Sequence, residues 1–191
     1  MERVLRLAEN RTDLGLYERF RNGDAAAFER IVMEHRRAVY SMARRLLSSH
    51  DDADEASQQT FVRAWRGRSR FRGEASIRTW LIGIALNVAR SMRGRTRGGE
   101  VETEYLEQLA DRSEGADQRL RREESRSRVR QVVAKLPPRQ REVVTLKVFS
   151  ELTYREVAGM MELSEGAVKA HLHQAVANLR RALIEDEGGG R

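Results

Sequence analysis

The chain contains no cysteine, so disulfide bridges and thiolate metal sites are excluded. Its four histidines are too few and too scattered to predict a zinc site on their own. No stretch approaches the roughly 20 consecutive apolar residues that a membrane span requires. Residues 1–20 carry charges throughout, without the apolar segment of a signal peptide. We therefore expect a cytoplasmic protein that has neither metal nor cofactor and does not insert into a membrane.

Aromatic residues are also scarce, at 6% of the chain, whereas charged residues make up 34%. This composition suits small helical bundles with wide solvated faces better than a deep enzyme fold, and 191 residues suffice for two such bundles. We find no paired nucleophile and base, no phosphate-binding glycine loop and no metal-ligand cluster. The predicted fold class is all-α, and an enzyme is not expected.

Positive charge exceeds negative charge, with 36 Lys and Arg against 29 Asp and Glu. Residues 61–97 contain ten arginines and one glutamate, a net charge of +9. Residues 98–125 have nine acids and four arginines (−5), and residues 126–184 have eleven basic and five acidic residues (+6). The pattern indicates two nucleic-acid-binding modules joined by an acidic linker. Composition alone favours equally an arginine-rich chain that uses the charge only for solubility.

The first module is predicted to be a bundle of three helices. A turn and N-cap at Asn22-Gly23-Asp24 precede the first helix, the second runs from near Asp51 to Gly67, and the third from about Ser76 to Arg93. Apolar spacing places Trp65 and Trp80 in the core. The stripe on the first helix consists of Phe28, Ile31, Val32, His35, Val39, Met42 and Leu46.

The loop between the second and third helices, residues 67–74, is rich in glycine and arginine and contains one aromatic residue, Phe71. It is too polar to be predicted as core. We expect Phe71 to be open and the loop to receive an unstacked base.

Residues 96–122 are predicted to form a flexible linker, because they are acidic, contain Gly98-Gly99 and lack an apolar stripe. The only prolines, Pro137 and Pro138, should end one helix near Lys135 and begin another near Arg139.

Residues 153–177 have the plan of a helix-turn-helix. Thr153 and Glu156 have capping-box spacing, and Ser164 is placed to cap a long final helix. Ala158 is small enough for a close helix crossing. Glu162 stands where this turn often has glycine, which predicts a looser turn or a different backbone conformation. An ordinary helical hairpin remains the alternative, and the spacing of His171 and His173 on different faces argues against a metal.

Three segments in order resemble extracytoplasmic-function (ECF, group IV) RNA polymerase sigma factors. Residues 52–65 resemble the polymerase-binding part of sigma region 2, and residues 71–87 look like the part that melts and reads the minus-ten element. Residues 136–143, 152–158 and 163–172 are similar to sigma region 4.

The resemblance implies two small helical bundles joined by a flexible linker, with region 2 at residues 14–95, the linker at 96–122 and a helix-turn-helix region 4 at 123–184. It implies binding to core RNA polymerase (the beta-prime clamp helices and the beta subunit), to promoter DNA and to an anti-sigma factor. The implied polymerase-binding residues are Asp52, Asp54, Glu55, Gln58 and Gln59. Those implied for the minus-ten DNA are Arg70, Phe71, Arg72, Ser76, Arg78, Asn87 and Arg90. Those implied for the minus-thirty-five DNA are Arg155, Ser164, Lys169, Ala170, His171, His173 and Gln174.

Two other functions are compatible with these residues. A stand-alone helix-turn-helix regulator would bind operators without polymerase, but it leaves the acidic segment at residues 51–55 without a purpose. An adaptor protein would show no affinity for DNA at low salt.

Overall fold

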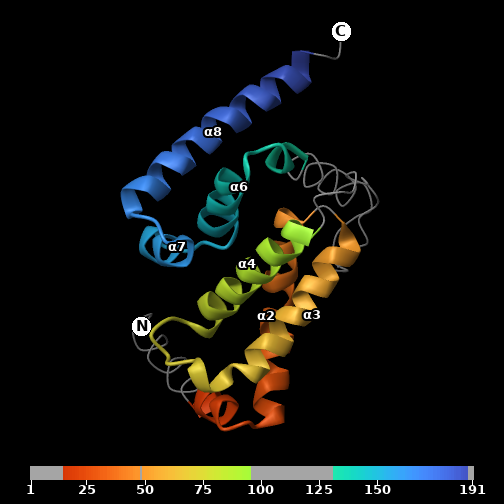
Figure 1. The fold of residues 1–191 in the computed structure, drawn as a ribbon, viewed down its shortest axis with the longest axis vertical. Helices are drawn as coiled ribbons and strands as arrows, with labels where there is room; N and C mark the ends of the chain where they lie inside the picture. Colours follow the sequence, from red (N-terminus) through yellow and green to blue (C-terminus); the bar gives the residue numbers. More distant parts are fainter. Residues whose placement is uncertain (1–14, 48, 96–130, 189–191) are drawn as a thin grey trace, which may run out of the picture. The chain divides into compact units, whose positions relative to one another are not determined.

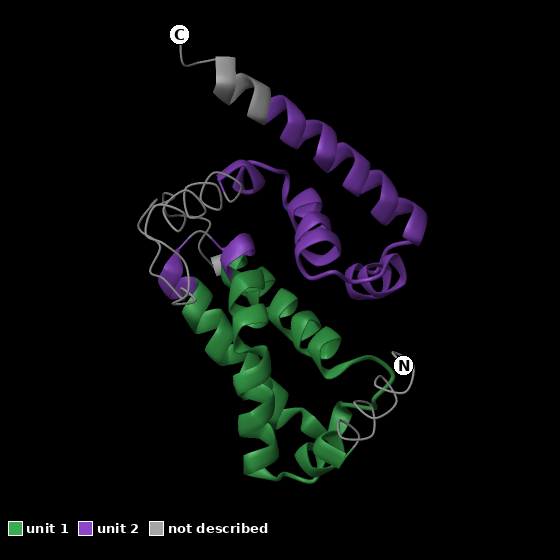
Figure 2. Ribbon diagram, turned by 180° about the vertical axis from the view of Figure 1, so that it is seen from behind, with its two compact units in different colours: residues 1–43, 53–97 green, residues 44–52, 98–191 purple. Residues whose placement is uncertain are grey.

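A computed structural model describes residues 15–47, 49–95 and 131–188 (Figure 1). These residues form helices, turns and short connections, without a strand among them, which confirms the predicted all-α class. The chain divides into two compact units, residues 1–43 with 53–97 and residues 44–52 with 98–191 (Figure 2). The predicted linker at residues 96–122 lies outside the described residues.

Unit 1 contains α2 (Ala25–Leu46), α3 (His50–Arg66) and α4 (Ile77–Arg95), which lie side by side in both views (Figures 1 and 2). A short 3-10 helix, η1 (Arg68–Arg70), follows α3. A further helix over residues 15–21 precedes α2. The predicted three-helix bundle is therefore present, with one more short helix packed before it.

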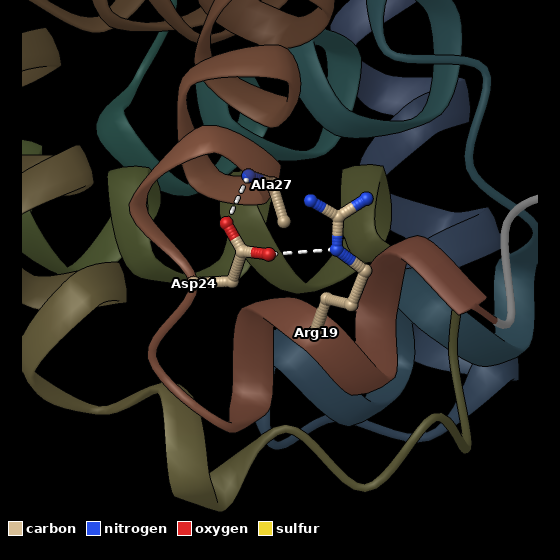
Figure 3. A network of polar contacts seen from close by, with 3 residues as sticks. All are labelled: Arg19, Asp24 and Ala27. Carbon is tan, nitrogen blue, oxygen red and sulfur yellow. Dashed lines mark hydrogen bonds and ion pairs between the residues drawn. The ribbon is translucent and has the colours of Figure 1, made fainter.

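Side-chain oxygens cap α2, α3 and α4, and the cap on α2 is the predicted one. The Asp24 carboxylate accepts the Ala27 N–H at 3.1 Å, which caps α2 (Figure 3). The Ser49 hydroxyl accepts the Asp52 N–H at 2.9 Å. The Ser76 hydroxyl accepts the Thr79 N–H at 3.0 Å at the start of α4. Each cap satisfies an amide that the helix cannot pair internally, so the starts of the helices are specified locally.

Most of the chain's few aromatic residues gather in the core of unit 1. The ring centroids of Phe20 and Phe28 lie 5.7 Å apart, and those of Phe28 and Trp65 lie 5.0 Å apart. Trp80 reaches the same cluster, 6.2 Å from Phe20. Both tryptophans pack against this cluster, as predicted, and each is half-buried. Such rings stabilise a small bundle because each buries a large apolar area.

Phe71 belongs to this cluster too, and the prediction that it is open is wrong. Its side chain is 3% exposed. Its ring lies 5.6 Å from Tyr17, edge to face, and 5.3 Å from Trp80. The helix at residues 15–21 contains Tyr17, against which the Phe71 ring packs. The polar residues beside Phe71 in the sequence give no sign of this contact. Burying the ring stabilises the loop by roughly 1.5–3 kcal/mol, which outweighs the polarity of its neighbours.

Unit 2 is built from α6 (Pro138–Val144), the π-helix η2 (Thr145–Phe149), α7 (Tyr154–Met161) and α8 (Glu165–Gly188). Pro137 and Pro138 occupy the cap and first position of α6, where a missing N–H costs nothing. The amphipathic helix predicted after the prolines is thus interrupted by a wider π-helical turn. In the core of unit 2, Leu136, Val144 and Ala175 are buried together, and Phe149, Leu172 and Leu179 pack against them.

The helix-turn-helix is present, formed by α7 and α8. Thr153 and Glu156 make a complete capping box, as predicted. The Ser164 hydroxyl accepts the Ala167 N–H at 3.1 Å and caps α8. Glu162 takes the left-handed conformation, with φ 56° and ψ 45°. The expectation of a different conformation at this position is therefore wrong: the glutamate adopts the backbone that glycine would favour.

Candidate nucleic-acid and polymerase interfaces

The residues expected to bind polymerase lie on one exposed stretch of α3. Asp54, Glu55 and Gln58 are exposed, while Asp52 and Gln59 are half-buried. The Gln59 amide donates to the Glu55 carboxylate at 2.6 Å. The Gln59 carbonyl accepts from Arg63 at 3.4 Å, one turn further on. This ladder along the helix holds an acidic and amide-bearing face toward solvent, suited to a basic partner.

The loop between α3 and α4 presents most of the residues expected at the minus-ten DNA. Arg70, Arg72 and Ser76 are exposed. Arg72 forms an ion pair of 3.9 Å with Glu74, and its side chain is 81% exposed. A pair this exposed contributes little, so Arg72 can leave it for a phosphate. Phe71 is the exception, because its buried ring does not face solvent.

The remaining residues expected at the minus-ten DNA, Arg78, Asn87 and Arg90, lie on α4. Asn87 is exposed, and Arg78 and Arg90 are half-buried. Positions 87 and 90 are three residues apart and so lie on neighbouring parts of one face. The structure therefore brings the loop arginines and one side of α4 into the same unit as the acidic face of α3.

The helix-turn-helix displays the remaining predicted residues. Lys169, Ala170, His173 and Gln174 are exposed on the first half of α8, and His171 is half-buried. Arg155 on α7 and Ser164 at the turn are exposed too. The core position Val168 and the buried Ala175 lie on the opposite side of α8. Donors and small residues thus share the face that a major groove would receive.

Two residues that the sequence analysis did not single out, Tyr154 and Lys147, lie close to Lys169 on this face. The Lys169 ammonium lies 5.4 Å from the centroid of the Tyr154 ring, and the Lys147 ammonium lies 4.9 Å from the same centroid. Tyr154 therefore holds two cations from different elements near the N-terminus of α7. The only signal in the sequence is that one of its few lysines precedes the helix-turn-helix and another lies within it, and their convergence on one ring needs the fold.

No group of three or more His, Asp or Glu side chains suited to a metal ion occurs in the part of the chain that the structure describes. None of the helices described there is long and apolar enough to cross a membrane.

Comparison with known proteins identifies both units. Residues 31–98 match Sigma-70 region 2, and residues 126–179 match Sigma-70, region 4. The chain is 29% identical over 181 residues to the RNA polymerase sigma-H factor of Pseudomonas aeruginosa, covering 90% of this chain and 93% of that one. It is 31% identical over 179 residues to the ECF RNA polymerase sigma-E factor of Salmonella typhimurium, covering 88% and 93%.

A solved structure of CnrH in complex with the cytosolic domain of CnrY has a similar fold, with a TM-score of 0.68 and 27% identity. The similarity covers 91% of this chain and 98% of CnrH. The two family matches place these helical units, one with an arginine-rich loop and the other with a helix-turn-helix, in the class of sigma-70-type transcription factors. Within that class, the chain belongs to the ECF-type RNA polymerase sigma factors.

Proposed function

We propose that this sigma factor, a group IV member without catalytic activity of its own, binds core RNA polymerase through α3. It then directs the enzyme to promoters that carry separate minus-ten and minus-thirty-five elements. The observation that carries the proposal is the presence, in one chain, of an exposed acidic and amide face on α3 and a capped helix-turn-helix with exposed donors. A stand-alone regulator would need only the second of these.

In this mechanism α8 reads duplex DNA. Lys169, His171 and Gln174 would donate to base edges or phosphates, and Ala170 would allow close approach or contact with a thymine methyl group. Each good base contact is worth on the order of 1–3 kcal/mol of discrimination. Arginine contacts with phosphates add affinity that falls as the salt concentration rises.

The loop and α4 of unit 1 would hold the melted minus-ten strand. Exposed Arg70 and Arg72 would neutralise phosphates, and Asn87 and Arg90 would extend the contact along α4. Capturing an unstacked base offsets a cost of a few kcal/mol in lost stacking. Because the Phe71 ring is buried, the captured base would meet the polar rim of the loop and not the exposed face of a free ring.

We also propose that an anti-sigma factor controls the chain by covering its polymerase- and DNA-binding faces. CnrH, which is similar over nearly its whole length, was solved in complex with the cytosolic domain of CnrY, so a chain of this fold forms a complex with another protein.

Run-off transcription from a promoter library tests the proposal. Purified core polymerase with this protein should start at a defined subset of promoters sharing two spaced elements, and core alone should not. Absence of selected start sites, with the protein free of any inhibitor, would overturn it. Operator binding without any association with core would instead support the stand-alone regulator.

A further inference from the structure

Arg68, the first residue of η1, differs from the other arginines around the loop because it is turned inward. It is half-buried, whereas Arg66, Arg70 and Arg72 are exposed. Its guanidinium carbon lies 4.7 Å from the centroid of the Trp65 ring. Its Nη1 donates to the Trp65 carbonyl at 3.0 Å. Arg68 therefore satisfies a carbonyl at the C-terminal end of α3, which the helix leaves unpaired, and stacks on the last aromatic residue of that helix.

The same guanidinium lies against the turn before α2. A Cβ atom added to Gly23 would lie 3.3 Å from Nη2 and 3.4 Å from Nε of Arg68. Gly23 also has φ +88°, a conformation that other residues rarely adopt. Glycine at this position thus permits both the turn and the close approach of the arginine. Arg68 connects the end of α3 to the turn that joins the helix at residues 15–21 to α2.

This connection fixes the start of the loop. The Arg70 N–H donates to the Gly67 carbonyl at 2.9 Å, and the Phe71 N–H donates to the Arg68 carbonyl at 3.1 Å. Phe71 then enters the core beside Tyr17. The loop is therefore attached at Arg68 and at Phe71, and between and beyond these points its arginines are exposed.

We propose that Arg68 is a positioning residue: its contacts with Trp65 and its close approach to the turn at Gly23 fix the conformation of the loop that presents Arg70 and Arg72 to the minus-ten strand. The inference rests on the proposed function for the meaning of the loop, but the anchoring can be measured without it. Unlike the exposed Arg70 and Arg72, Arg68 itself makes no contact with DNA in this proposal.

Hydrogen exchange of the full chain tests the anchor. In Arg68→Ala the amides of Arg70 and Phe71 should exchange about tenfold faster or more, because local opening becomes easier. Amides of α8 should be unchanged, and so should the loop amides in the control Arg66→Ala, which removes an exposed charge nearby. Arg68→Lys should resemble Arg68→Ala, since an ammonium lacks the planar fork that stacks and donates. Unchanged exchange at Arg70 and Phe71 in both variants would overturn the proposal.

Transcription by the reconstituted holoenzyme tests the consequence. Arg68→Ala and Arg68→Lys should each lower initiation from a duplex promoter about fivefold or more. The loss should be smaller on the same promoter premelted across the minus-ten element. The affinity of both variants for core should stay within about twofold of wild type. Activity of Arg68→Lys close to wild type, with Arg68→Ala impaired, would indicate a direct phosphate contact and overturn the positioning role. An equal loss in Arg66→Ala would overturn it too.

The two tests separate the two proposals. If wild-type protein directs no promoter-specific transcription, the proposed function fails while hydrogen exchange still decides the anchor. If wild-type protein is active and both Arg68 variants keep its activity, the inference fails alone. Should Arg68→Ala unfold, Arg68→Lys carries both measurements.

Discussion

At the scale of single residues, Asp24 has two roles at the junction before α2. One carboxylate oxygen accepts the Ala27 N–H, and the other pairs with the Arg19 guanidinium at 2.7 Å (Figure 3). The hydrogen bond from Arg19, followed by that from Ala27, lowers the pKa of Asp24 below its usual value. The same side chain thus caps one helix and ties it to the helix before it.

This lowered pKa predicts how the stability of unit 1 depends on pH. Because the pKa of Asp24 is lower in the folded chain, its contribution is present above the unfolded value of about 3.9 and is lost as pH falls through the folded value. Asp24→Asn keeps an acceptor for Ala27 but has no charge, so its stability should vary less with pH below about 4. Denaturant titrations followed by tryptophan fluorescence report this unit, since both tryptophans lie in it.

Arg19→Met provides the control for this prediction. It should reduce the pH dependence in the same direction, and the double variant should add little to either single one, because both remove the same ion pair. An Asp24→Asn variant with the acid sensitivity of wild type would contradict the assignment.

Glu162 is a second position where one residue has a measurable effect. Its left-handed backbone costs about 1–2 kcal/mol for a residue with a Cβ atom, whereas glycine loses roughly 0.5–1 kcal/mol of extra chain entropy on folding. Glu162→Gly should therefore stabilise unit 2 by about 0.5–1 kcal/mol, which corresponds to about two- to fivefold slower exchange of buried α7 amides. Glu162→Ala retains the Cβ atom and should show no such gain. Equal exchange rates of the α7 amides in the glycine and alanine variants would show that the left-handed backbone at position 162 is not strained.

At the scale of elements, α7 has only 8 residues, so its ends decide its stability. The Thr153 hydroxyl accepts the Glu156 N–H at 3.2 Å, and the Glu156 carboxylate accepts the Thr153 N–H at 2.8 Å. These two bonds pair amides that the helix cannot satisfy. The short first helix of the helix-turn-helix therefore depends on its capping box as much as on its packing.

Thr153→Ala should destabilise α7 by about 1 kcal/mol, because it removes half of the capping box. Exchange of α7 amides should become about fivefold faster. Thr153→Ser retains the hydroxyl and should stay close to wild type. Indistinguishable exchange in the alanine and serine variants would show that the cap does not stabilise this helix.

At the scale of the whole molecule, binding of polymerase and binding of the minus-thirty-five element are assigned to different units. The acidic face lies on α3, mostly in unit 1, and the helix-turn-helix lies in unit 2. The two functions should therefore be separable by mutation.

Reversing charge in the double variant Asp54→Lys and Glu55→Lys should lower affinity for core by about tenfold or more, because both charges would then oppose a basic partner surface. Lys169→Ala should leave core binding intact and weaken promoter binding, with a slope of log affinity against log salt smaller by about 1. Pull-down with core polymerase and salt titration of holoenzyme on promoter DNA measure the two effects. Loss of both activities in either variant would contradict the separation.

The class of the fold and most of the helices follow from local patterns along the chain. Helical periodicity and caps are local properties, so the caps at Asp24 and Ser164 and the Thr153–Glu156 box could be predicted with their roles. The residues expected on α3 and α8 are largely exposed because they lie outside the apolar stripe of each helix. The spacing of the apolar residues in the sequence already shows where that stripe runs.

What the loops between the helices contact depends on how distant segments pack together. Whether Phe71 faces solvent depends on Tyr17, which is 54 positions away in the sequence, and the role of Arg68 depends on the space that Gly23 leaves open. Lys147 and Lys169 likewise converge on Tyr154 only once three elements have packed. Such contacts join segments distant along the chain, and a local pattern of apolar and charged residues does not specify which surface each loop will meet.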